Sequence, residues 1–246
     1  MRLLEDLTAR LRHALAGRPA VPEPAPVSAP RAQPPIGTHA RPVRGWVQPD
    51  RRSCGAACLV VSRALGDPSY AAWLETGEVA GRPRDRRTPG RRFADEVLAT
   101  HVRTNRWIDA LGRPQWAWPR GLGTPPWSLA RELTATGGTS PPGTGHRVLT
   151  VSPRRHGEAY DVVTRAVAHG HAVPLYVGTR LLPRHVVLVV GGDAAALEAY
   201  DPSSGRTVRL PREDFVRGHL EVAGWSEPWF AVLARGGATP GADWRP

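Results

Sequence analysis

The sequence of 246 residues contains no lysine, although it has 33 basic residues against 22 acidic ones. The formal charge of +11 therefore comes from arginine. Exclusive use of arginine is typical of a GC-rich coding sequence, so the high isoelectric point says little about nucleic-acid binding. We do not expect a nucleic acid to be a partner of this chain.

Cysteine is also scarce, since only Cys54 and Cys58 occur, four residues apart in a stretch predicted to be helical. This excludes a disulfide framework and leaves a four-ligand zinc site without a matching pair of cysteines. Zinc held by both cysteines and two of His169, His171 and His185 stays as an alternative. Otherwise we expect no metal or organic cofactor.

Long apolar runs are absent, because no stretch approaches the roughly 20 residues that cross a bilayer. The N-terminus opens with Arg2, and its leucines are interrupted by Glu5 and Asp6. It therefore lacks the continuous apolar core and cleavage site of a secretory signal. We expect a cytoplasmic protein with no transmembrane segment.

Composition divides the chain into four segments. Residues 1–17 predict an amphipathic helix, 18–44 a Pro/Ala-rich extended linker, 45–235 a compact domain, and 236–246 a flexible tail. The apolar face of the first segment is formed by Leu3, Leu4, Leu7, Leu11, Ala14 and Leu15. This helix has three open interpretations: it packs back on the domain, binds a partner protein, or lies on a membrane surface.

The compact domain changes character along its length. Helices are predicted over 53–65, from just before 129 to 136, and over 160–167. Strands are predicted over 148–151, 172–177, 185–190, 197–200, 207–210 and 230–233. A helix-rich first half followed by a strand-rich second half predicts an α+β fold.

Two stretches have an unusual composition. Residues 82–92 contain six arginines and one aspartate, interrupted by proline and glycine, which predicts a surface loop whose charge is either solvated or available to an acidic partner. Farther along the chain, four tryptophans cluster among prolines: Trp107, Trp116, Trp118 and Trp127. They could pack in the core or in loops, or form a platform for a ligand.

Cys54 lies at the predicted start of a helix. The helix dipole and the unpaired N–H groups of the first turn stabilise a thiolate there, and the thiolate is the nucleophilic form of cysteine. Cys54 is thus a candidate nucleophile, with a structural role as the alternative. Cys58 lies one turn deeper, where we expect a small buried hydrophobe.

His185 opens an apolar strand, and Asp201 ends the next strand sixteen residues later. An antiparallel pairing of these strands would set the carboxylate beside the imidazole. In that geometry a carboxylate orients the base that activates a thiol. A structural histidine at 185 and a simple turn at 201 remain alternatives.

The string Gln48-Pro-Asp-Arg-Arg-Ser-Cys54-Gly-Ala-Ala-Cys58-Leu, with His185-Val-Val-Leu-Val and Tyr200-Asp201-Pro202 downstream, resembles a family of papain-like cysteine peptidases. These peptidases process double-glycine leader peptides in bacteriocin exporters and have stand-alone bacterial relatives. The resemblance implies a papain-like fold and a Cys54, His185 and Asp201 triad, with Gln48 helping to form the oxyanion hole. The stretch beginning Gly123-Thr is similar to the helix start before the second half of such domains.

The chain departs from the family pattern in two ways. It is longer than the usual domain, so residues 76–122 look like an insertion over or near the cleft. No exporter membrane region or nucleotide-binding cassette follows, so the expected substrate is a peptide or protein of unspecified kind. The same triad could serve an acyltransferase, deamidase or isopeptidase, and the fold could also be a catalytically silent peptide-binding module.

Overall fold

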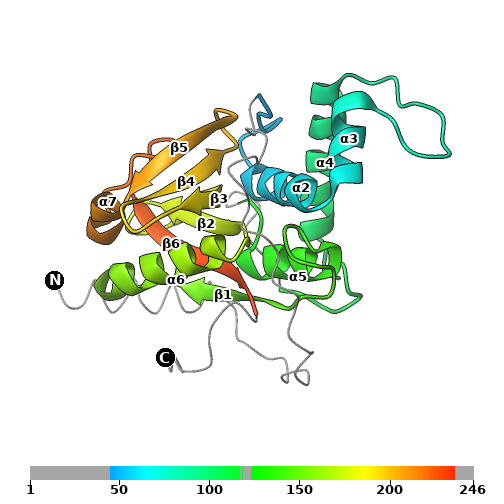
Figure 1. The fold of residues 1–246 in the computed structure, drawn as a ribbon. Helices are drawn as coiled ribbons and strands as arrows, with labels where there is room; N and C mark the ends of the chain where they lie inside the picture. Colours follow the sequence, from blue (N-terminus) through cyan, green and yellow to red (C-terminus); the bar gives the residue numbers. More distant parts are fainter. Residues whose placement is uncertain (1–44, 117, 119–122, 236–246) are drawn as a thin grey trace.

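The computed structural model describes residues 45–116, 118 and 123–235. The predicted helix over 1–17, the linker over 18–44 and the tail over 236–246 lie outside these residues. Within them, helices precede an antiparallel sheet in the chain, which confirms the α+β prediction (Figure 1).

The helices begin at or near proline or cysteine in most cases. They are α2 (Cys54–Gly66), α3 (Pro68–Thr76), α4 (Pro89–Thr104), α5 (Pro126–Thr136), α6 (His156–Ala168) and α7 (Arg212–Arg217), with a 3-10 turn at Pro153–Arg155. The strands are β1 (His146–Thr150), β2 (Val173–Gly178), β3 (Pro183–Gly192), β4 (Ala196–Asp201), β5 (Arg206–Pro211) and β6 (Glu227–Ala234). Each predicted strand corresponds to one of these.

The strands form one sheet of six in the order β1-β6-β2-β3-β4-β5, with every neighbouring pair antiparallel. Side chains alternate across β3: Val186 and Leu188 join the core under α2, while Val187 and Val189 join the core under α6. Helices therefore cover both faces of the sheet, which explains why β3 is a continuous apolar run.

Helix α2 is buried from its first residue, because Cys54 to Ser62 all lie in the interior. Its second position must be glycine for packing reasons. A Cβ at Gly55 would lie 2.8 Å from Cβ of Thr124, just ahead of α5. Gly55 thus lets the two segments approach closely at the end of α2 that carries Cys54.

The prediction of a loop over 82–92 is wrong for its last four residues, which open helix α4. Thr88 is the N-cap, its side chain accepting the Arg91 N–H at 3.3 Å, and Pro89 occupies the first turn. Arg92 is buried and donates to backbone carbonyl oxygens of Leu74, Asp85 and Arg87. It is a structural link between α3 and the loop, and its charge does not face solvent.

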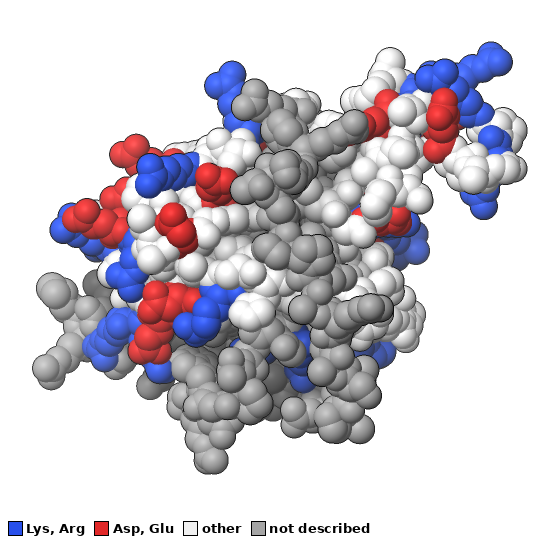
Figure 2. Space-filling model, viewed as in Figure 1, with Lys and Arg blue, Asp and Glu red and all other residues white. Residues whose placement is uncertain are grey.

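The remaining charge in this region is partly neutralised. Arg87 pairs with Asp85 at 2.6 Å and with Asp95 at 2.7 Å, and Arg91 pairs with Asp95 at 3.0 Å. Figure 2 shows basic and acidic side chains side by side on this projection, at the upper right. The surface is therefore mixed in charge, and less basic than the composition of 82–92 suggested.

The predicted insertion over 76–122 contains part of the core. Phe93 and Val97 of α4 are buried with α2, and the ring of Trp46 stacks on Phe93 with centroids 5.3 Å apart. Helix α4 therefore packs beside α2 (Figure 1) and supports it directly.

The four clustered tryptophans divide into two pairs. Trp118 and Trp127 pack edge to face with ring centroids 5.0 Å apart, which agrees with the packing alternative for this pair. Trp107 and Trp116 are exposed, at 73% and 82% of their surface. These two do not belong to the core.

Candidate functional site

Cys54 is the first residue of α2. The N–H groups of the first helical turn have no carbonyl partner within the helix, and the side chain of the N-cap residue Ser53 makes no capping bond to them. The sulfur of Cys54 therefore lies where helix geometry favours a negative charge. Cys54 is enclosed, with 3% of its surface exposed.

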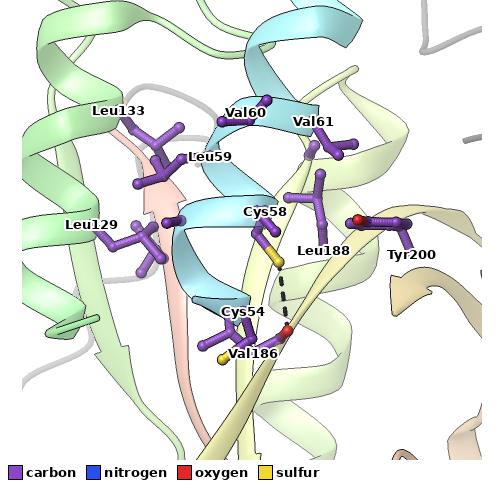
Figure 3. Packing of buried hydrophobic residues seen from close by; sticks show 14 of the residues in the cluster. Cys54, Cys58, Leu59, Val60, Val61, Leu129, Leu133, Val186, Leu188 and Tyr200 are labelled. Carbon is purple, nitrogen blue, oxygen red and sulfur yellow. Dashed lines mark hydrogen bonds between the residues drawn. The ribbon is translucent and has the colours of Figure 1, made fainter. Parts of the chain in front are cut away.

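Cys58 lies one turn further along the same helix (Figure 3). It is fully buried, and its thiol donates to the carbonyl oxygen of Val186 at 3.5 Å. Burial, together with the nearby Cys54 and Asp201, raises the pKa of the Cys58 thiol well above its ordinary value. Cys58 is the small buried residue that the sequence predicted.

His185 and Asp201 are brought together by the pairing of β3 with β4. The register places Leu188 opposite Tyr200. His185, three residues before Leu188, and Asp201, directly after Tyr200, therefore lie at the same end of this strand pair. Nε2 of His185 lies 2.8 Å from Oδ1 of Asp201, and both residues are buried.

The charges of this pair reinforce each other. Burial lowers the pKa of His185, but its hydrogen bond to Asp201 and its interaction with the Cys54 thiol outweigh burial and raise the pKa to about 9. Burial raises the pKa of Asp201, but hydrogen bonds from His185 and Ser203 outweigh this and hold it well below its usual range. At neutral pH the histidine is therefore an imidazolium between a carboxylate and the Cys54 thiol. Since Asp201 occupies Nε2, Nδ1 is the nitrogen left for the sulfur.

Two serines that the sequence analysis did not assign complete the surroundings of Asp201. Ser203 donates its N–H to Oδ1 at 2.9 Å and its hydroxyl to Oδ2 at 2.7 Å, and Ser204 donates its hydroxyl to Oδ2 at 2.9 Å. Aspartate followed two residues later by serine is a turn signal that could have revealed them. Asp201 thus both binds the imidazole and closes the turn.

Gln48 is held beside that turn by its backbone. Its N–H donates to the carbonyl of Pro202 at 2.8 Å, and the N–H of Gly45 donates to the carbonyl of Gly205 at 3.0 Å. The Oε1 atom of Gln48 is buried and has no hydrogen-bond partner among the described residues. The structure therefore positions the main chain of Gln48 next to Asp201 but does not anchor its amide oxygen.

The segment at Gly123 lies against the start of α2. A Cβ at Gly123 would lie 2.8 Å from the carbonyl oxygen of Arg52 and 4.0 Å from Sγ of Cys54, and its φ of +75° favours glycine. The hydroxyl of Tyr176 on β2 donates to the carbonyl of Thr124 at 2.9 Å. Backbone without side chains thus borders the Cys54 sulfur on this side.

The zinc alternative finds no support in the geometry. In the part of the chain that the structure describes, no group of three or more histidine, cysteine, aspartate or glutamate residues is placed to hold a metal ion. Nδ1 of His171 lies 2.9 Å from the Ser140 hydroxyl, and Nδ1 of His169 lies 2.7 Å from the carbonyl of Arg165. The same described residues include no helix that is long and apolar enough to span a membrane.

The different surroundings of the two cysteines predict selective alkylation. Iodoacetamide near neutral pH should label Cys54 before Cys58, because Cys54 has an imidazolium and a helix start beside it whereas Cys58 donates into the core. Both residues lie in the tryptic peptide Ser53–Arg63. Tandem mass spectrometry of that peptide after short pulses measures the order. Earlier labelling of Cys58 would remove Cys54 as the reactive thiol.

The raised pKa of His185 predicts a charge effect on alkylation. Below about pH 9 the imidazolium attracts the anion iodoacetate, so the ratio of its rate to that of neutral iodoacetamide should be high and should fall as His185 loses its proton near pH 9. Removing the negative charge in Asp201→Asn lowers the pKa of His185, so the fall should move to lower pH. An unshifted profile in Asp201→Asn would show that Asp201 does not set this pKa.

Comparison with known proteins adds no relative: no family model matches the sequence, and a search of curated proteins also gave no match.

Proposed function

We propose that the chain is a thiol-dependent hydrolase of papain-like fold, a cysteine peptidase that acts on a peptide or protein. The single observation that carries this proposal is the buried contact of 2.8 Å between His185 Nε2 and Asp201 Oδ1, with the imidazole also interacting with the Cys54 thiol at the start of α2. A cysteine, a histidine and a carboxylate in this order of contact are the elements of a nucleophilic triad. The packing of the Cys54 helix against an antiparallel sheet supports a papain-like arrangement.

The proposed reaction begins with attack of the Cys54 thiolate on the substrate carbonyl carbon. The carbonyl π electrons move to oxygen, and the backbone N–H of Cys54 and the amide N–H of Gln48 hold the resulting oxyanion. The tetrahedral intermediate collapses as His185 gives its proton to the leaving amine, which leaves a thioester on Cys54. Water then attacks the thioester, losing a proton to His185, and the acid product leaves as the thiolate returns.

Asp201 has an orienting role in this scheme. Its carboxylate is fixed by His185 and by donors from Ser203 and Ser204, so it holds the imidazole with Nδ1 toward the sulfur. The carboxylate keeps its negative charge throughout and stabilises the imidazolium. No step requires a metal ion or organic cofactor.

Any reaction that passes through a thioester fits the same residues, so acyl transfer, deamidation and isopeptide cleavage are variants of this proposal. The silent peptide-binding module has one observation in its favour, the 3% exposure of Cys54. We also propose a cytoplasmic location, because Cys54 and Cys58 are both unpaired and free thiols persist in reducing compartments.

The proposal is tested by incubating the full chain with a proteome-derived peptide library and a panel of peptides with C-terminal electrophiles. We expect new peptide termini and one covalent adduct on Cys54, both missing in Cys54→Ala. Adding hydroxylamine during turnover and looking for hydroxamate products separates acyl transfer from hydrolysis, because hydroxylamine competes with water for the thioester. Peptides bound but never cleaved or trapped would favour the silent binding module.

A further inference from the structure

Exposed apolar side chains extend from α4 into the segment after it. They are Leu98, Val102, Trp107, Ile108, Leu111 and Trp116, which we call the α4–hairpin surface. Leu98 and Val102 lie four residues apart on the helix, and the hairpin is closed by a bridge between Ile108 and Pro114. Exposed apolar surface containing tryptophan is typical of interaction sites.

The hairpin that carries both exposed tryptophans is firmly held. The amide of Gln115 donates to the carbonyl of Thr104 at 3.2 Å and accepts from the hydroxyl of Ser128 at 2.5 Å. Arg131 of α5 forms an ion pair with the buried Asp109 at 3.2 Å. These contacts fix the hairpin to α4 and α5. The tryptophans are therefore displayed on a preorganised support, which lowers the entropy cost of binding.

The described domain begins beside α4. The Trp46 ring stacks on Phe93 of α4, and the N–H of Gly45 donates to the carbonyl of Gly205 at 3.0 Å. Phe93 and Val102 are nine residues apart, which is about 14 Å along a helix. A linker of 27 residues has an end-to-end distance of about 30 Å when flexible and about 84 Å when fully extended as polyproline.

We propose that the leucine face predicted for residues 1–17 docks on the α4–hairpin surface of the same molecule. The tether is long enough to reach and short enough to hold the segment at an effective concentration on the order of millimolar. The segment offers leucines at helical spacing, and the surface offers a helix face and two aromatic anchors. This is recognition of an apolar helix face by an apolar surface, made intramolecular.

The charges of the segment favour this occupant over a membrane. Helices that lie on membranes carry a strongly basic polar face. Residues 1–17 have three arginines, at 2, 10 and 12, against Glu5 and Asp6, so their net charge is close to neutral. Burial of the leucine face against protein does not need a cationic surface.

The test is hydrogen–deuterium exchange of the full chain, comparing wild type with Leu7→Ser/Leu11→Ser. Asp6→Ser/Arg10→Ser is the matched control, because it has the same spacing, leaves the net charge unchanged and spares the apolar face. We expect faster exchange both over 3–15 and over 98–116 in the leucine variant, by about tenfold or more, and wild-type exchange in the control.

A variant of the surface, with residues 1–17 unaltered, excludes the explanation that the leucine substitutions only unfold the predicted helix. Trp107→Ser/Trp116→Ser leaves residues 1–17 unaltered and should speed exchange over 3–15, whereas Val79→Ser, at an exposed site outside the surface, should not. Protection over 98–116 that is independent of the leucines overturns the proposal. Protection that rises with protein concentration assigns the surface to contact with a second copy of the chain. Binding of residues 1–17 to anionic vesicles, with no change in exchange over 98–116, assigns these residues to a membrane. Either result also overturns the proposal.

Discussion

Replacing Cys54 with alanine should lower peptide turnover by roughly 10⁴- to 10⁶-fold, the range expected when the nucleophile of a triad is removed. The thioester cannot form without the sulfur, and the remaining oxyanion donors contribute only a small residual rate. Turnover is measured on the best peptide from the library, with circular dichroism to show that the fold is retained.

The matched control is Cys58→Ala on the same helix. Cys58 is fully buried and donates to Val186 in the core, so its loss should affect stability more than turnover. Comparable loss of turnover in both variants at equal foldedness would mean that α2 is needed for shape, and that Cys54 carries no covalent step.

Replacing His185 with alanine should cost nearly as much turnover as loss of Cys54, because triad members act as a unit. It should also slow iodoacetamide labelling of Cys54, since the imidazolium beside the sulfur is removed. Gln48→Ala should behave differently: turnover should fall by about 100- to 1,000-fold while labelling stays near wild type, because an oxyanion donor acts only on charge developing in the substrate.

Turnover and the rate of Cys54 labelling together distinguish a general base from an oxyanion donor. Neither measurement requires the natural substrate to be known. If Gln48→Ala slows labelling as much as His185→Ala does, the Gln48 side chain supports the start of α2 and does not serve the oxyanion. If Gln48→Ala leaves turnover unchanged, the unanchored amide is not part of the reaction. The alternative of a catalytically silent peptide-binding module would be favoured if both variants left peptide affinity unaltered and the wild type showed no turnover.

The sheet and the His185–Asp201 contact could be predicted from sequence because both depend on short-range rules. Apolar strands separated by Gly- and Asp-containing turns give the order β3-β4-β5, and antiparallel pairing then leaves little freedom in where Asp201 meets His185. The start of α2 was predicted for a similar reason. Its apolar run begins directly at Cys54.

Helices α3 and α4 were not predicted because their start signals were interpreted as breaks. Pro68 follows closely after α2 and is typical of a helix end, yet Asp67 accepts N–H groups of Ser69 and Tyr70 at 3.0 Å and starts α3. Proline ends one helix and opens another with the same local chemistry. Tertiary packing decides which of the two a given proline does. For α4 that packing is the contact of Phe93 and Val97 with α2.

The burial of Arg92 and the exposure of Trp107 and Trp116 could not be predicted from composition. Arginine is rarely buried and tryptophan is rarely this exposed, so residue-type preferences indicated the opposite in each case. Arg92 is buried because three carbonyl oxygens satisfy its guanidinium, and those oxygens come from segments whose arrangement is known only after folding.

Asp201 contacts both His185 and the turn after β4, and this limits which residues its position could accept in evolution. The carboxylate that faces His185 also accepts hydrogen bonds from three donors of Ser203 and Ser204 and closes the connection between β4 and β5, to which residues 45–48 are hydrogen-bonded. If the proposed function holds, a descendant that lost catalysis would still need an aspartate or asparagine at this position to keep the hairpin. Retention of Asp201 in a diverged sequence would then indicate the architecture, whereas retention of the Cys54 thiol would indicate the proposed chemistry.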